Sequence, residues 1–412
     1  DRGAVEKLRR HLLEAPDLQV VRMRPFEVAD RWGEDRMEAL RLFLRAARAG
    51  ALDLVWSVIC PTCRVPSREA SALSQVKSQV HCDTCGIGFG ADLARSVEAR
   101  FSVNPAVRPA RRETYCIGGP ANMPGIVAQL RLEPGETRKE AFSNKGELRI
   151  RCYQAPGIQP LSGMRVRVEA GGLRVEPGEA DLLEVTNGLA TEALVVVERE
   201  TWREGAATAA MVTSIQDFRD LFPAEAVAPG EELGISSLAV LFTDLKGSTD
   251  LYRQLGDSQA FSFVQNHFRY LTEAVARNRG GVVKTMGDAV MATFARGRDA
   301  VAAALEMQRD WKAFRASRGQ GELTLKIGIH QGPSIAINNA GMLDYFGTTV
   351  NTAARVQAQS QGDDIVVSRA VAEDPDARPL LERAGLAGET FRRTLKGLDG
   401  DHELTRVRIM KL

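Results

Sequence analysis

Three short polar segments in the second half of the chain constrain its fold more than any other feature. The first, Leu238–Thr249, is an apolar strand that reaches an aspartate. The second, Gly281–Phe294, contains two short strands around a Gly-Asp turn. The third, Asp344–Arg355, ends in a predicted helix. Each segment alone is modest evidence, but all three in this order and spacing predict one site built at the edge of a sheet.

Two aspartates in these segments are suited to binding divalent metal. Asp244 follows a buried strand, and Asp288 lies in a tight hairpin turn that Gly287 permits. If the strands are neighbours, both carboxylates lie at one edge of the sheet. Mg²⁺ prefers carboxylate and phosphate oxygens, and two metals at this edge would activate a hydroxyl and stabilise a leaving pyrophosphate.

The third segment offers an arginine suited to phosphate chemistry. Asn351 and Arg355 are four positions apart on the predicted helix, so they project from one face. An arginine there would stabilise charge that builds on a phosphoryl group. Taken singly, such residues are more often structural, because an aspartate at a strand end is commonly a cap and a helix-face arginine is commonly solvated. Their joint occurrence favours a functional site.

Together these residues resemble the class III nucleotidyl cyclase domain, over residues 236–412. The resemblance implies that Asp244 and Asp288 bind two Mg²⁺ or Mn²⁺ ions in each active site. It assigns purine recognition to Lys284 and Asp344, and this pair is typical of enzymes that take ATP rather than GTP. Ribose orientation, transition-state stabilisation and a triphosphate contact fall to Asn351, Arg355 and Lys396, respectively.

The resemblance also implies a fold and an assembly. It indicates a ferredoxin-like α+β core that works as a homodimer, in which one subunit supplies Asp244 and Asp288 and the other supplies the remaining site residues. Strands are expected near 238–243, 282–286, 289–294, 323–329, 364–367 and 403–409. A helix is expected over 261–275, ended by Gly280 and Gly281, and a second over 301–314. One departure from the family pattern is the segment His330–Asn338, which carries asparagine where a small residue is usual.

Four cysteines in the first half have the spacing of a metal site. Two C-x-x-C pairs separated by 18 residues predict a zinc ribbon with one structural Zn²⁺, whose ligands are Cys60, Cys63, Cys82 and Cys85. A redox dithiol is the alternative, but it would leave one pair surplus. His81 is interpreted as a neighbour of the site. Cys116 and Cys152 have no partner spacing and are interpreted as buried apolar residues.

The elements around the cysteines predict a small regulatory region. Two helices over 25–33 and 35–49 precede a strand over 52–58, an order that suits a winged-helix module or a protein-interaction platform. Arg36, Arg41, Arg45 and Arg48 form a basic stripe, but acidic neighbours dilute it, so a solvated helix face is the preferred interpretation. Between 126 and 200 the apolar period changes to two, which predicts an antiparallel β-sandwich or barrel.

Composition limits the remaining choices. The 412 residues suffice for two or three domains, and the formal charge of +1 argues against strong attraction to nucleic acid or an anionic membrane. No apolar run approaches a membrane span and no signal peptide is recognised, so with its reduced cysteines the chain is expected to be cytoplasmic. It begins at Asp1 rather than Met, which leaves a preceding segment open.

The sequence therefore predicts a multidomain α+β adenylate cyclase that converts ATP to 3′,5′-cyclic AMP and pyrophosphate. The expected parts are a helical, winged-helix-like segment with the zinc ribbon (1–120), a β-rich regulatory domain (121–200), a linker or transducing segment (201–235) and the cyclase domain (236–412). Two alternatives stay open. One is a catalytically weak nucleotide-binding sensor. The other is a zinc-ribbon, winged-helix regulator of nucleic acid that uses the cyclase fold to dimerise.

Overall fold

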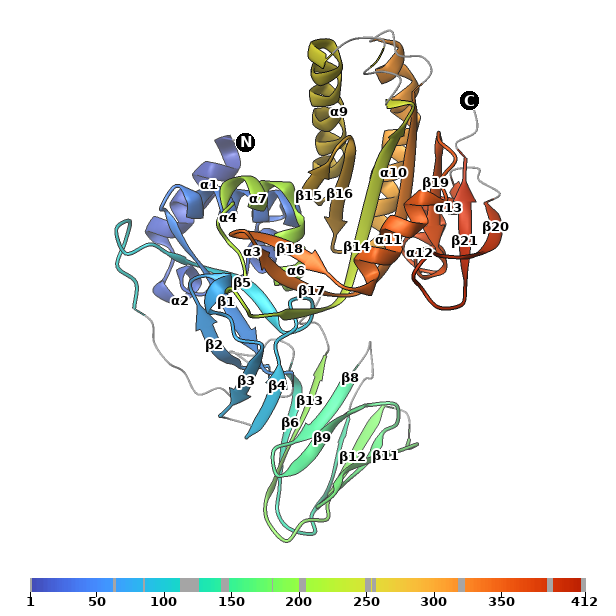
Figure 1. Ribbon diagram of the computed structural model, residues 1–412. Coiled ribbons are helices and arrows are strands. Elements are labelled where there is room, and N and C mark those ends of the chain that lie inside the picture. Colours follow the sequence, from blue (N-terminus) through green and yellow to red (C-terminus); the bar gives the residue numbers. More distant parts are fainter. Residues whose placement is uncertain are drawn as a thin grey trace.

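A computed structural model describes residues 2–61, 64–83, 86–111, 126–141, 148–179, 181–199, 205–248, 253, 257–317, 323–383 and 388–408. Figure 1 shows the N-terminal helices and small sheets beside a larger C-terminal sheet, with a β-sandwich at the bottom of the view. No helix in the described part of the chain is long and apolar enough to cross a membrane.

The N-terminal region begins with helices and continues as a three-stranded sheet. Helix α4 starts where the Asp35 carboxylate accepts hydrogen bonds from the amides of Met37 and Glu38. The two helices and the strand expected here correspond to α3, α4 and β1, and the sheet order is β2-β1-β5. The elements are α1 (Arg2–Glu14), α2 (Asp17–Val20), α3 (Pro25–Trp32), α4 (Arg36–Arg48), β1 (Leu52–Ile59), β2 (Pro66–Ala70), η1 (Leu73–Gln75), β3 (Gln79–Cys82), β4 (Ile87–Gly90) and β5 (Val97–Val103).

Residues 126–199 form two packed four-stranded sheets, of order β11-β10-β12-β7 and β6-β13-β8-β9. Alternating apolar residues of both sheets, such as Ile150 and Val166, form one core between them. The antiparallel prediction is wrong for one pair, because β10 runs parallel to β12. The strands are β6 (Ile126–Leu132), β7 (Thr137–Ala141), β8 (Leu148–Cys152), β9 (Ala155–Pro160), β10 (Arg165–Glu169), β11 (Gly172–Glu176), β12 (Leu182–Asn187) and β13 (Ala193–Arg199).

The C-terminal region is built on one mixed sheet of order β15-β16-β14-β17-β19-β21-β20, with β18 paired to β17. The unit β14-α9-β15-β16-α10-β17 has the strand order β17-β14-β16-β15, which confirms the ferredoxin-like prediction for this part. The strands are β14 (Leu233–Lys246), β15 (Gly280–Met286), β16 (Ala289–Phe294), β17 (Thr324–Asn339), β18 (Met342–Phe346), β19 (Asp364–Ser368), β20 (Glu389–Thr394) and β21 (Asp401–Val407). The helices are α9 (Asp257–Arg277), α10 (Gly297–Ala316), α11 (Thr348–Ala358), α12 (Arg369–Ala372) and α13 (Arg378–Arg383).

Two details of this region differ from the expectation. Helix α9 ends at Arg277, Arg279 takes the left-handed conformation with φ 64°, and Gly280 already opens β15. Gly280 is needed there for close packing, because a Cβ atom would lie 2.3 Å from the ring of Phe294. Strand β17 extends well beyond the expected 323–329 and includes the His330–Asn338 segment.

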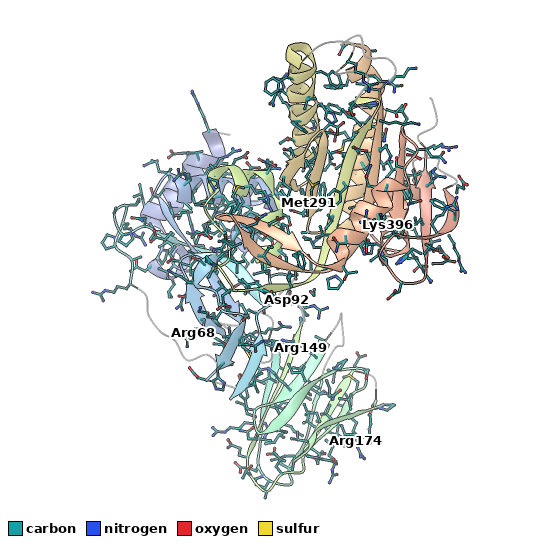
Figure 2. The ribbon with its side chains drawn as sticks, in the orientation of Figure 1. Arg68, Asp92, Arg149, Arg174, Met291 and Lys396 are labelled. Carbon is teal, nitrogen blue, oxygen red and sulfur yellow. The ribbon has the colours of Figure 1, made fainter. Side chains whose placement is uncertain are left out.

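The two faces of the C-terminal sheet belong to different cores. Ala239 and Leu241 of β14 face α9 and α10, whereas Leu238 and Val240 face the N-terminal region. Met291 lies on this second face (Figure 2). Apolar side chains of β1, β5, α6 (Ala209–Ser214) and α7 (Gln216–Leu221) complete the same core. The N-terminal region and one face of the sheet thus share a continuous interior.

The segment 201–235 differs most from its expected form as a linker. Its described part, from residue 205, carries two short helices and contributes Val212, Ile215 and Phe218 to the shared core. Phe218 packs edge-on against Trp56 of β1, with ring centroids 5.8 Å apart. Val227, in the stretch expected to be a turn-rich connection, is fully buried. This segment is therefore an interior layer between the N-terminal region and the sheet.

Candidate active site

Asp244 and Asp288 lie close together at one end of the sheet. Asp244 lies inside β14, two residues before its end, and its neighbour Thr243 pairs with Val290 just after the β15–β16 turn. Gly287 adopts φ 64° in that turn, as the tight bend requires. Burial raises the pKa of Asp244, and the charge of Asp288 raises it further.

The electrostatics of this carboxylate pair suit a cation. The Oδ2 atom of Asp288 is buried without a hydrogen-bond partner among the described residues. Two neighbouring carboxylates, one of them with an unsatisfied buried oxygen, form a donor set that a divalent metal ion would complete. The residues present therefore fit the metal ions that the sequence implies.

Lys284 and Asp344 form a preorganised ion pair. The Nζ atom of Lys284 lies 2.6 Å from Oδ2 of Asp344, which also accepts a hydrogen bond from Nδ2 of Asn339 at 2.9 Å. The Oδ1 atom accepts from the backbone N–H of Tyr345 at 2.8 Å. Burial raises the pKa of Asp344, but these donors outweigh it, and the net pKa lies below the ordinary value. The carboxylate is therefore an ionised acceptor at neutral pH.

Asn339 was missed from the sequence as a site residue. It lies one position beyond the His330–Asn338 segment that departs from the family pattern, and its contact with Asp344 depends on the β17–β18 hairpin, in which Asn339 pairs with Met342 and Ile337 with Asp344. Its neighbour Asn338 closes the same hairpin by accepting from the amide of Gly341 at 2.9 Å. The polar side chains of this segment thus fix the turn that presents Asp344.

Asn351 and Arg355 project from α11 as expected, and both side chains are exposed. The helix lies unusually close to β17 because two glycines remove side chains between them. A Cβ at Gly328 would lie 2.2 Å from the Cα of Gln357, and one at Gly332 would lie 2.7 Å from Oγ1 of Thr349. These glycines determine the distance between α11 and β17. They therefore also determine the positions of the Asn351 and Arg355 side chains.

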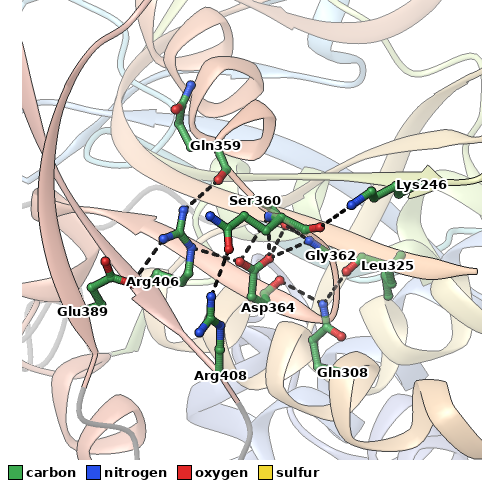
Figure 3. A network of polar contacts seen from close by, with 11 residues as sticks. Lys246, Gln308, Leu325, Gln359, Ser360, Gly362, Asp364, Glu389, Arg406 and Arg408 are labelled. Carbon is green, nitrogen blue, oxygen red and sulfur yellow. Dashed lines mark hydrogen bonds and ion pairs between the residues drawn. The ribbon is translucent and has the colours of Figure 1, made fainter.

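A buried polar network holds the chain after α11 (Figure 3). Asp364 accepts hydrogen bonds from the backbone amides of Gln361 at 3.1 Å and Gly362 at 3.2 Å. The Nε atom of Arg406 lies 3.0 Å from Oδ2 of Asp364, and its Nη2 donates to the carbonyl of Gln359 at 3.0 Å. The network ties the C-terminal end of α11 to β19 and β21, so the helix is fixed at this end.

Lys396 is exposed in the turn between β20 and β21 (Figure 2). It makes no hydrogen bond or ion pair within the described residues. The structure therefore brings together Asp244 with Asp288 and Lys284 with Asp344, and places Asn351 beside Arg355 on one helix face. It does not join Lys396 to any of these groups within one chain.

The cysteine region is described in part. Cys60 and Cys82 are both buried and belong to one small apolar cluster, whereas Cys63, Cys85 and Cys116 lie outside the described residues. No group of three metal-ligating side chains occurs among the residues described. The side chain of His81 is 59% exposed. Cys152 is buried in the sandwich core, as predicted.

The described residues at the ends of the two C-x-x-C pairs share two backbone features. The residues that follow the C-x-x-C pairs, Arg64 and Gly86, adopt φ 62° and 65°. The N–H of Arg64 donates to the carbonyl of Cys60 at 3.0 Å, and that of Gly86 donates to the carbonyl of Cys82 at 2.8 Å. The same backbone contact thus recurs at both pairs, and Cys60 and Cys82 belong to one cluster.

Three arginines of the basic stripe on α4, Arg36, Arg41 and Arg45, form ion pairs within the chain. Arg36 forms a two-bond contact with Asp30, at 2.7 Å each. Arg41 and Arg45 donate to the carboxylate of Asp217 on α7, at 3.1 and 2.9 Å. These arginines hold elements of the protein together, which gives them a structural role.

Family comparisons divide the chain into two parts. Residues 232–376 match the family described as the adenylate and guanylate cyclase catalytic domain. Residues 1–114 match a family of unknown function, DUF5939. The catalytic-domain match begins at the start of β14 and includes the sites of Asp244, Asp288 and α11.

Two similar proteins each align with less than half of this chain. An adenylate cyclase of Mycosarcoma maydis is 30% identical over 199 residues, which cover 40% of this chain and 8% of that protein. An adenylate cyclase of Anabaena cylindrica is 26% identical over 159 residues, covering 34% of this chain and 32% of that protein. The chain thus spans a third or less of the length of these relatives.

Solved structures of an adenylyl cyclase and a guanylyl cyclase are each similar to less than half of this chain. The adenylyl cyclase CyaB from P. aeruginosa is 21% identical, with a TM-score of 0.39, over 44% of this chain and 97% of that chain. The guanylyl cyclase Cya2 is 19% identical, with a TM-score of 0.38, over 44% of this chain and 96% of that chain. From the family match, the C-terminal part of the chain carries an adenylate and guanylate cyclase catalytic domain.

Proposed function

We propose that the chain is an adenylate cyclase that converts ATP to 3′,5′-cyclic AMP and pyrophosphate. The observation that carries the proposal is the preformed pair of Lys284 and Asp344, with 2.6 Å between Nζ and Oδ2. Adenine presents an amino donor at its 6-position, whereas guanine presents an oxygen acceptor there. An ionised Asp344 accepts from the adenine amino group and repels the guanine oxygen, and Lys284 donates to the adjacent ring nitrogen. The pair therefore favours ATP over GTP.

Asp244 and Asp288 would hold two Mg²⁺ or Mn²⁺ ions in this proposal. When bound, such ions lower the pKa of the ribose 3′-hydroxyl and neutralise the triphosphate. The unsatisfied Oδ2 of Asp288 and the raised pKa of Asp244 support this assignment. With the ions bound, the two carboxylates would help to hold the triphosphate in place relative to the ribose, and such positioning is a large part of what an in-line displacement requires.

The α11 side chains would act on the ribose and the phosphates. Asn351 orients the ribose so that the 3′-oxygen attacks the α-phosphorus, and the bond to the β-phosphate oxygen breaks as pyrophosphate leaves. Arg355, with Lys396, stabilises the negative charge that develops on the phosphate oxygens. The proton of the 3′-hydroxyl passes to substrate or water, because no side chain of the described site is placed as a general base.

The same proposal includes a homodimer with shared sites. Asn351, Arg355 and Lys396 are all exposed, so they are accessible to a nucleotide bound mainly by another copy of the chain. Two identical copies would form two equivalent sites related by a two-fold axis. The N-terminal regions, including one structural Zn²⁺ on the four cysteines, would regulate how the two copies come together. The residues that each copy contributes to a shared site would then be brought together or kept apart.

The direct test measures cyclic nucleotide formation from ATP and from GTP, with Mg²⁺ and with Mn²⁺, on the purified chain. Cyclic AMP from ATP, with at least about tenfold less product from GTP, is expected; each tenfold corresponds to about 1.4 kcal/mol. Arg355→Ala should remove most turnover without unfolding, because the side chain is exposed, and Arg309→Ala on the exposed surface of α10 is the matched control. Cyclic GMP as the main product would contradict the purine assignment. Nucleotide binding without turnover would instead favour a sensor.

A further inference from the structure

The short helix α7 contacts both strands that carry the purine-recognition pair. Lys284 belongs to β15, and Asp344 belongs to β18. These strands are not hydrogen-bonded neighbours in the sheet, so their relative position is not set by a shared ladder. A side chain of α7 reaches each of them.

Gln216 holds the strand of Lys284. Its Oε1 accepts a hydrogen bond from the backbone N–H of Val282 at 2.8 Å, while its Nε2 donates to Asp220 at 2.8 Å and so fixes the amide orientation. The β15–β16 register shifts between Val282 and Lys284, which marks a bulge at this point of the edge strand. A bulge changes the direction of the side chains that follow it. Gln216 therefore binds the backbone at the bulge that determines the direction of the Lys284 side chain.

Arg219 holds the strand of Asp344 from both sides of that residue. Its Nη1 donates to the carbonyl of Leu343 at 3.3 Å, and its guanidinium lies 5.5 Å from the ring centroid of Tyr345. The hydroxyl of Tyr345 in turn donates to Oγ1 of Thr213 on α6 at 3.1 Å. The residues before and after Asp344 are thus both held by the α6–α7 segment.

The same helix is bound to the N-terminal region. Asp217, between Gln216 and Arg219, accepts from Arg41 and Arg45 of α4 at 3.1 and 2.9 Å. Arg41 also donates to the carbonyl of Ala276 at the end of α9, at 3.2 Å. Helix α7 therefore connects the N-terminal region, the Lys284 strand and the Asp344 strand.

We propose that Gln216 and Arg219 are positioning residues for purine recognition, and that α7 transmits the state of the N-terminal region to nucleotide affinity and selectivity. The inference rests on the proposed adenylate cyclase function. The purine pair contacts the base in the ground state and in the transition state alike, so a displaced pair weakens both equally. Such uniform binding changes KM and leaves kcat nearly constant. Loss of a metal-binding carboxylate would instead lower kcat.

The experiment compares four variants with wild type for KM, kcat and the ratio of ATP to GTP use. Arg219→Met removes the guanidinium but keeps an unbranched chain, and Gln216→Met removes the amide acceptor. Each is expected to raise KM for ATP about tenfold, with kcat within about twofold. Gln216→Glu keeps an acceptor oxygen for Val282 but replaces the donor to Asp220 with a second carboxylate, so it should recover only part of the loss. Arg309→Met, on the exposed surface of α10, is the matched control and should leave both constants unchanged.

Direct binding separates this inference from the proposed function. ATP and GTP affinities are measured by calorimetry on the full chain. If wild type binds ATP over GTP without turning it over, the proposed activity fails, but loss of that preference in Arg219→Met still supports the positioning role. The positioning role would be overturned if Arg219→Met and Gln216→Met both kept the wild-type ratio of ATP affinity to GTP affinity. It would also be overturned if these variants lowered kcat while KM stayed constant. A wild-type chain that binds neither nucleotide overturns both proposals.

The connection to the N-terminal region has its own variant. Asp217→Asn removes the charge that pairs with Arg41 and Arg45 but preserves shape, and it should raise KM for ATP about threefold with kcat unchanged. The exposed Asp310→Asn on α10 serves as control. Equal KM values for wild type and Asp217→Asn would contradict transmission through this helix.

Discussion

The Nζ atom of Lys284 lies 2.6 Å from Oδ2 of Asp344, although 60 positions separate the two residues in the chain. The side chain of Asp344 is 8% exposed and that of Lys284 is 37% exposed. The carboxylate is therefore buried in the protein, whereas the ammonium group is accessible to solvent. Asn339 provides a second donor to the same carboxylate oxygen at 2.9 Å. This arrangement holds an acceptor and a donor in place before any nucleotide arrives.

Exchange of this pair should change nucleotide preference. In the double variant Lys284→Glu, Asp344→Cys, a carboxylate replaces the ammonium and a small thiol replaces the carboxylate. The ratio of ATP to GTP use is expected to fall at least about a hundredfold, since two base contacts worth about 1–3 kcal/mol each are reversed. Initial rates with both nucleotides measure the ratio. Lys312→Glu on the exposed surface of α10 controls for the added charge, and an unchanged ratio in the double variant would contradict the purine assignment.

Neutralising Asp244 should raise the unfolding temperature of the protein while lowering its turnover. Its pKa is raised, so the folded chain binds this proton more tightly than the unfolded chain, and ionisation at neutral pH disfavours the fold. Asp244→Asn is therefore expected to unfold at a higher temperature than wild type at pH 7 without divalent metal, while losing at least about a hundredfold in turnover. The gap should close as pH falls through the folded pKa, because the wild-type carboxyl is then neutral too.

Added Mg²⁺ provides the control for this prediction. An ion that binds the folded chain raises the unfolding temperature of wild type but not that of a variant lacking its ligand. Asp310→Asn, on the exposed surface of α10, should respond to Mg²⁺ as wild type does. Equal stabilisation of Asp244→Asn and wild type by Mg²⁺ would contradict the metal assignment.

Gly328 should be irreplaceable even by alanine. The added Cβ would lie 2.2 Å from the Cα of Gln357, and backbone atoms cannot move aside as a flexible side chain does. Gly328→Ala is expected to lower stability by about 1–3 kcal/mol and to displace α11, with a loss of turnover of at least about tenfold. Denaturant unfolding and initial rates measure the two effects. Gly171→Ala, at a position with no atom within 4 Å of the new Cβ, should leave both unchanged.

Much of the C-terminal fold could be predicted because its strands carry local signals. The strand expected over 289–294 matches β16 (Ala289–Phe294), whose residues are nearly all buried. Strand β20 (Glu389–Thr394) was missed because five of its six side chains are exposed and it has no apolar alternation. This segment forms a strand because it pairs with β21. Such pairing depends on the tertiary structure and cannot be inferred from the β-propensity of the residues alone.

The site residues that could be predicted are those whose spacing along the chain matches that of class III nucleotidyl cyclases. Arg219 and its partner Leu343 are 124 positions apart, and Arg41 and Asp217 are 176 apart, so no local pattern links them. The segment that carries Arg219 and Asp217 was interpreted as a linker or transducing segment, because two helices of six residues each are too short to indicate which elements they contact. Burial by the N-terminal sheet and the C-terminal sheet gives it structure.

His330 should make the fold sensitive to mild acid. Burial, with a smaller effect of His402, lowers the pKa of His330 to about 4, and its Nδ1 lies 2.8 Å from Oγ of Ser368. The unfolded chain binds this proton near pH 6.5, so stability falls as the pH drops from 6.5 toward 4, by about 1–3 kcal/mol. His330→Asn should flatten the profile of unfolding free energy against pH in this window. His81→Asn, with a 59% exposed side chain in wild type, is the control and should keep the wild-type slope.

The cysteine pairs should bind zinc and stabilise the N-terminal region. Cys60 and Cys82 lie in one buried cluster, and the carbonyl of each accepts a hydrogen bond from the residue that follows its C-x-x-C pair, Arg64 or Gly86. Cys82→Ser is expected to reduce zinc from about one ion per chain to near zero and to lower the unfolding temperature, because a structural zinc site contributes folding free energy directly. A chelator should destabilise wild type but not this variant. Cys152→Ser, in the sandwich core, should retain full zinc content. A chain that purifies without zinc and gains no stability when zinc is added would instead favour a redox role for the thiols, which thiol titration under oxidising and reducing conditions would detect.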